Sequence, residues 1–175
     1  MTINDLNNQF IRINDFNTNY ITLIFENINY RFDFLGKKEA FLKEKNECKL
    51  LLFSDHPLLI DYNESFLEIF LNSKPQNIDF FLENIERIIH NRVLGFRKLK
   101  DYLNKSNLDF ETFLKNINEG NGKFLNAPFS IINEIEKFFI ENNIKFKTFG
   151  EPKNFKNQLL ILDNQYVIAT EFKLK

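Results

Sequence analysis

Residues 77–104 constrain the fold of this chain more than any other stretch, because their apolar side chains recur at steps of three and four. This spacing is that of one face of an α-helix. The face consists of Ile78, Phe81, Leu82, Ile85, Ile88, Ile89, Val93, Phe96, Leu99 and Leu103. The sequence therefore predicts a long central helix at 77–104, with Asn77 as its N-cap residue.

Gly95 lies inside this predicted helix. A straight helix of that length would be about 40 Å long, which exceeds the width of a compact domain of this size. Glycine also costs about 0.5–1 kcal/mol in a helix interior relative to alanine. We therefore expect a bend or break near Gly95, and we expect both Ile85 and Phe96 in the core.

Strands are predicted on both sides of the central helix. Alternation of apolar and polar residues, with turn residues between the runs, indicates strands at 10–13, 20–25, 30–34, 159–162 and 166–172. Shorter runs indicate further strands at 49–53, 58–61, 66–71, 123–125 and 144–149. Helices are expected at 37–47, 109–118 and 128–142, the last with Asn126 as its N-cap residue.

The order of these elements predicts an α+β fold. Runs of strands and helices without regular alternation favour a mostly antiparallel sheet, built from a meander and hairpins and packed on one face by about three to four helices. A length of 175 residues suits a single domain over 1–175. A weak boundary between two subdomains would lie near Gly120–Gly122.

Composition limits the classes of function. The formal net charge of −1 gives no global field for nucleic acid or an anionic membrane, and no run is apolar enough to span a bilayer. The single cysteine, Cys48, excludes an internal disulfide, and the first ten residues do not resemble a signal peptide, so we expect a cytoplasmic protein. The 22 Phe and absent Trp indicate an AT-rich genome rather than a function.

The one candidate catalytic site is the segment that carries Asp55, His56, Asp61 and Tyr62. A histidine beside carboxylates can act as a general base, because its pKa lies near neutral pH. The alternative is structural: Asp55 would bond turn amides, and His56 would be a surface or boundary residue before Pro57, where an exposed bend would leave its pKa ordinary. The sequence favours this alternative.

Basic residues gather in the second half of the central helix, at Arg92, Arg97, Lys98 and Lys100. They are spread around the helix and interleaved with acidic residues, so a solvated face is favoured over nucleic-acid binding. His90 is expected at the polar margin of the same helix.

No motif for a metal, a cofactor or a nucleophilic serine occurs, and we predict no cofactor and no metal. The leading hypothesis is a non-catalytic protein that binds another protein, as an accessory, adaptor or immunity-like protein. The alternatives are a small hydrolase or transferase that uses His56, and a weak nucleic-acid binder. Self-association through an edge strand at 166–172 is a further possibility for the partner.

Overall fold

The computed structural model describes residues 2–175, and the contacts within the chain divide it into two compact units. Unit 1 combines the segment that ends at Tyr62 with the segment that begins at Lys156, and unit 2 is Asn63–Phe155. Gly120–Gly122 lies inside unit 2, and the division between the units falls where the chain enters and leaves unit 2. Whether the whole chain unfolds as one domain stays a prediction.

The α+β class is confirmed, and unit 1 is its mainly β part. Its strands form one antiparallel sheet in the order β11-β3-β2-β1-β5-β9-β10-β4. They are β1 (Phe10–Phe16), β2 (Tyr20–Phe25), β3 (Ile28–Leu35), β4 (Glu39–Phe41), β5 (Glu47–Phe53), β9 (Gln158–Leu162), β10 (Gln165–Ala169) and β11 (Glu171–Leu174). Short helical turns, η1 (Ile3–Leu6), η2 (Pro57–Leu59) and α1 (Ile60–Asn63), complete the elements of this part of the chain. The predicted hairpin across Asp163 and Asn164 is confirmed as β9 and β10.

The sheet of unit 1 closes on itself. The chain runs from β3 directly into β4, and the chain that pairs with it runs from β10 directly into β11, so the two ends of the strand order are joined. Phe34 pairs with Phe172, and Ala40 pairs with Val167. Between these pairs, main-chain hydrogen bonds join Thr170 N–H to the Leu35 carbonyl (3.0 Å) and Lys38 N–H to the Ile168 carbonyl (2.8 Å). The inward side chains form a buried core that includes Ile13, Leu23, Phe32, Leu50 and Leu162.

Three predictions for unit 1 are wrong. Residues 37–47 are not a helix, because β4 pairs with β10 there and β5 begins at Glu47. Residues 58–61 are not a strand, because η2 begins directly after His56 and α1 follows it at Ile60. Tyr166–Ile168 is not an open edge for a dimer, because β9 and β4 pair with it on both sides.

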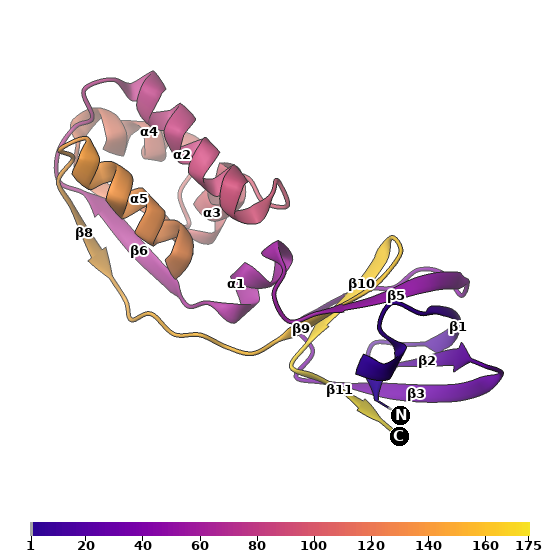
Figure 1. Ribbon diagram of the computed structural model, residues 1–175. Helices are drawn as coiled ribbons and strands as arrows, with labels where there is room; N and C mark the ends of the chain where they lie inside the picture. Colours follow the sequence, from indigo (N-terminus) through magenta and orange to yellow (C-terminus); the bar gives the residue numbers. More distant parts are fainter. Residues whose placement is uncertain (1) are drawn as a thin grey trace. The chain divides into compact units, whose positions relative to one another are not determined.

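Unit 2 packs helices on a three-stranded antiparallel sheet in the order β7-β6-β8 (Figure 1). Its elements are β6 (Phe66–Leu71), α2 (Ile78–Val93), α3 (Leu99–Lys105), α4 (Phe110–Glu119), β7 (Gly122–Pro128), α5 (Phe129–Glu141) and β8 (Phe146–Phe149). Leu67, Ile69 and Leu71 are buried on one face of β6, and Figure 1 shows α5 lying along this strand. Because β7 continues to Pro128, Asn126 lies in a strand and is not a helix N-cap.

The central helix breaks where a break was expected. α2 ends at Val93, Leu94 and Gly95 take left-handed conformations (φ 48° and 78°), and α3 begins at Leu99. Ile85 is buried, as predicted. Phe96 is 46% exposed, which contradicts its predicted core position, because the chain leaves the helical path before it reaches this residue.

Candidate functional site

His56 is the N-cap of the η2 turn. Its Nδ1 atom accepts a hydrogen bond from the main-chain N–H of Leu58 (3.2 Å), and its ring lies 5.1 Å from the ring of Phe53. Partial burial lowers the pKa of His56, although the negative charge of Asp55 acts in the opposite direction. His56 is therefore a half-buried boundary residue, and its pKa lies below the ordinary value that we expected for an exposed bend. Its observed role at Nδ1 is to begin a helical turn.

The other residues of the predicted catalytic segment have different surroundings and different roles. Asp55 is exposed, and Asp61 lies half-buried on α1. The hydroxyl of Tyr62 donates to Glu39, whose carboxylate also accepts a hydrogen bond from Tyr166 (2.5 Å). This Tyr–Glu–Tyr cluster joins α1, β4 and β10, and sequence reasoning missed Glu39 and Tyr166 because they lie far along the chain.

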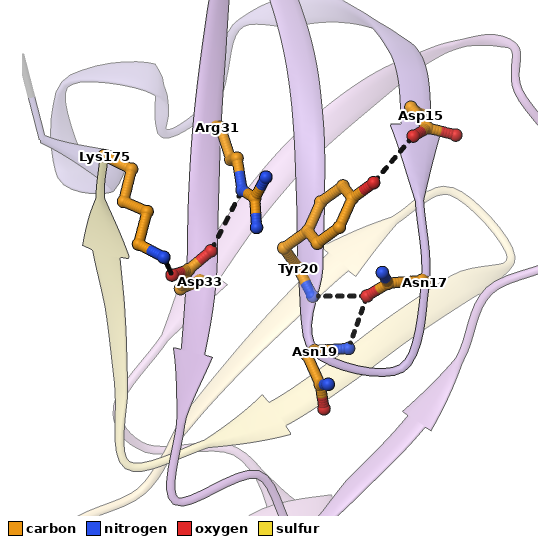
Figure 2. Close-up of polar contacts among 7 residues, drawn as sticks. All are labelled: Asp15, Asn17, Asn19, Tyr20, Arg31, Asp33 and Lys175. Atoms are coloured by element: carbon orange, nitrogen blue, oxygen red, sulfur yellow. Dashed lines mark hydrogen bonds and ion pairs between the residues drawn. The ribbon is translucent and has the colours of Figure 1, made fainter.

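A second polar cluster lies on β1, β2 and β3 of unit 1 and includes Lys175 (Figure 2). Tyr20 donates its hydroxyl proton to Asp15 (2.8 Å), and Arg31 lies over the Tyr20 ring at 3.9 Å. Asp33 pairs with Lys175 (2.7 Å) and with Arg31 (3.1 Å).

Local pairing explains the pKa shifts in this cluster. The hydrogen bond from Lys45 is the main cause that lowers the pKa of Asp15, and the hydrogen bond from Lys175 is the main cause for Asp33. Hydrogen bonding to Asp15 raises the pKa of Tyr20. Because these charges already have partners within unit 1, we interpret the cluster as an ordered surface rather than a reactive site.

A concave surface with largely apolar walls lies in unit 2, and we call it the helix groove. It consists of two adjoining hollows of about 480 Å³ and 340 Å³ that share Glu86 and Leu99. The larger hollow lies between α2, α3 and the start of α4. It is lined by Glu86, Leu99, Lys100, Leu103, Asn104, Leu108, Asp109 and Phe110.

The smaller hollow lies beside the break between α2 and α3. It is lined by Glu86, Ile89, His90, Gly95, Arg97, Lys98 and Leu99. His90 is exposed, as expected for the polar margin of the helix.

Apolar side chains form much of the helix groove. Leu99 and Leu103 are buried, and Leu108 is half-buried. Phe110, the first residue of α4, is 57% exposed at the rim. The Asp109 carboxylate caps α4 by accepting the Thr112 N–H (2.7 Å), and this hydrogen bond is the main cause that lowers the pKa of Asp109.

Three of the predicted basic residues border the helix groove, namely Arg97, Lys98 and Lys100. Arg92 is exposed near the end of α2 and does not line either hollow. Neither Lys98 nor Lys100 has an ion pair within residues 2–175. Their charges therefore remain available to a binding partner.

Within residues 2–175, no three His, Cys, Asp or Glu side chains are placed together so that they could hold a metal ion. In this part of the chain, no helix has the length and apolar character needed to cross a membrane.

No protein family matches the sequence, and no similar curated protein or solved structure was found.

Proposed function

We propose that this protein acts by binding another protein, without catalysing a reaction, as an accessory, adaptor or immunity-like protein. The observation that carries the proposal is the helix groove, whose apolar floor ends at the exposed ring of Phe110. Aromatic anchors beside desolvated apolar surface contribute much of the binding energy in protein interfaces.

The two alternative functions have weaker support. A general base needs a ring nitrogen with a lone pair free to take a substrate proton. Nδ1 of His56 accepts the Leu58 N–H, so the neutral ring carries its proton on Nε2 and its accepting nitrogen is already engaged. Nucleic acid needs a surface of one sign, whereas Glu86 and Asp109 lie among the basic residues of the helix groove.

We also propose a cytoplasmic location, which the state of the single cysteine supports. Cys48 is buried and forms no disulfide. A reducing compartment keeps thiols in this state.

The test is affinity capture from the native host with the full-length chain. We expect one stoichiometric partner with the wild-type protein, and its loss with Phe110→Asp, because a charge would be placed against the apolar floor. Phe149→Asp is the matched control, because Phe149 is 54% exposed on β8 and lies outside the groove. Equal capture by all three proteins, or the absence of any stoichiometric partner, would overturn the proposal.

A further inference from the structure

The helix groove offers its occupant side chains rather than main-chain partners. Around its rim, the main-chain N–H groups of Lys98 and Leu108 already donate to the Asp101 carboxylate and to the Leu103 carbonyl oxygen. An extended peptide needs partners for its own N–H and carbonyl groups, whereas a helix satisfies them internally. A helix can therefore bury an apolar face in this groove without leaving its main chain unpaired.

The charges at the two ends of the groove differ. Arg97 and Lys98 border the hollow beside the helix break, and Glu86 lies between the hollows. At the other end, Asp109 lies beside Lys100 and at the N-terminus of α4. The end beside the break is therefore the more positive one.

A helix is itself polar, with partial positive charge at its N-terminus and partial negative charge at its C-terminus. Its C-terminus is best placed near Lys98, and its N-terminus near Asp109. Acidic side chains in its last turns would add pairing with Lys98, whose charge has no ion-pair partner in the described chain.

We infer that the occupant of the helix groove is an amphipathic helix of a partner protein, acidic in its C-terminal half and oriented with that half toward Lys98. The inference rests on the proposed protein-binding function and specifies the partner's conformation, charge and direction. The apolar face of that helix contacts Leu99, Leu103 and Phe110, and its polar face remains in water.

The experiment titrates the full-length protein with three designed peptides of about 18 residues, roughly five helical turns. All carry the same leucine stripe at helical spacing. The first has glutamates only in its last two turns, the second only in its first two turns, and the third equals the first with a central proline that breaks the helix. Fluorescence anisotropy measures the dissociation constants.

We expect the first peptide to bind roughly three- to tenfold more tightly than the second, from the helix dipole and rim charge pairs. The proline peptide should bind most weakly. Lys98→Glu should remove the preference between the first two peptides, and Phe110→Ser should weaken both. Lys173→Glu, at an exposed position of unit 1, is the matched control and should change nothing.

Three outcomes would overturn the inference: equal binding of the proline peptide, equal binding of the two charge orders to the wild-type protein, or no saturable binding by any peptide. Affinity capture separates this failure from failure of the proposed function. A partner lost on Phe110→Asp, combined with failure of the peptides, would refute only the helical occupant. Absence of a groove-dependent partner would refute the proposed function itself.

Discussion

Phe155 donates its main-chain N–H to the carbonyl oxygen of Asn63 over 2.7 Å, so the chain enters and leaves unit 2 side by side. The contact continues into the unit, where Ser65 N–H donates to the Lys153 carbonyl and Lys153 N–H donates to the Ser65 hydroxyl, each over 2.8 Å. The two ends of the inserted unit are therefore held together by bonds within unit 2.

A fragment limited to residues 63–155 should fold by itself. Its sheet and the four helices α2–α5 lie within the fragment, and the contacts between residues 63–65 and 153–155 remain available to hold its ends. A unit with its own core and adjacent ends can fold without the flanking chain. We expect a cooperative urea transition and a dispersed amide NMR spectrum. A fragment with helical circular dichroism but no cooperative transition would show that unit 2 depends on the rest of the chain.

Gln165 should be among the least replaceable polar residues of unit 1. Its side chain is 1% exposed. Its Oε1 atom accepts the main-chain N–H groups of Lys43 (2.5 Å) and Glu44 (2.8 Å), and its Nε2 donates to the Glu44 carbonyl (3.2 Å). Gln165→Leu removes these bonds and leaves polar groups unsatisfied, at a cost of roughly 1–3 kcal/mol.

The control for Gln165→Leu is Gln76→Leu at an exposed position, which should change the free energy of unfolding by less than about 0.5 kcal/mol. Urea denaturation measures both. Equal urea midpoints for the two variants would contradict the structural role of Gln165.

The same glutamine explains why local patterns misassigned residues 37–47. Their charge and spacing suit a helix, but main-chain bonds to Gln165 and pairing with Tyr166–Ile168 hold them extended. Both partners are more than 100 residues away, with separations of 122 for Lys43 and 121 for Glu44. Local propensity yields to such tertiary contacts. The hairpin of β9 and β10 was predictable because its turn and both strands are adjacent in sequence.

The candidate site was predictable only in part. The sequence showed Lys98 and Lys100 as part of a cluster of basic residues, and it predicted the break near Gly95 that exposes this region. The groove itself joins Ile89, Leu103 and Phe110 from three different helices. Their spacing gives no sequence motif, since a groove depends on how helices pack and not on the pattern along any one of them.

His56 should make the stability of the protein depend on pH in a defined direction. Its pKa is lowered in the folded protein from an ordinary 6.5, so below that value the unfolded state binds more protons. This contribution to stability is present above pH 6.5 and is lost as the pH falls through the lowered pKa.

His56→Asn is the comparison for this pH dependence, because asparagine can still accept the Leu58 N–H at the N-cap but does not titrate. We expect a smaller loss of stability in the variant than in the wild type when urea midpoints are compared between about pH 7.5 and pH 5. Parallel pH profiles for the two proteins would show that His56 does not titrate as its environment implies.

Cys48 should be unreactive in the folded protein. Burial raises the pKa of its thiol from 9.0 to about 12, and the nearby charge of Asp163 acts in the same direction. Because the thiolate is the reactive form, a disulfide reagent such as Ellman's reagent should modify the native protein slowly at about pH 8. The urea-unfolded protein is the control and should react quickly with one thiol per chain. Rapid labelling of the native protein would contradict the buried position of Cys48.

Gly120 and Gly95 test whether close packing or backbone conformation is the reason that glycine is required at a position. Both have a positive φ, 65° and 78°, so alanine at either position should cost roughly 1–2 kcal/mol from the left-handed conformation alone. Gly120 differs in its surroundings, because an added Cβ would lie 2.1 Å from the main-chain nitrogen of Lys74. At Gly95 the nearest atom would be a ring carbon of His90 at 3.4 Å, an ordinary contact.

We therefore expect Gly120→Ala to cost about 3 kcal/mol in the free energy of unfolding, because the main chain must shift in addition to the strain that both variants share. Gly95→Ala, the matched control, should cost only the shared part. Urea denaturation of the two variants beside the wild type measures the difference. If the two substitutions lower stability equally, the close approach of Gly120 to Lys74 has no energetic consequence, and conformation alone requires glycine at that turn.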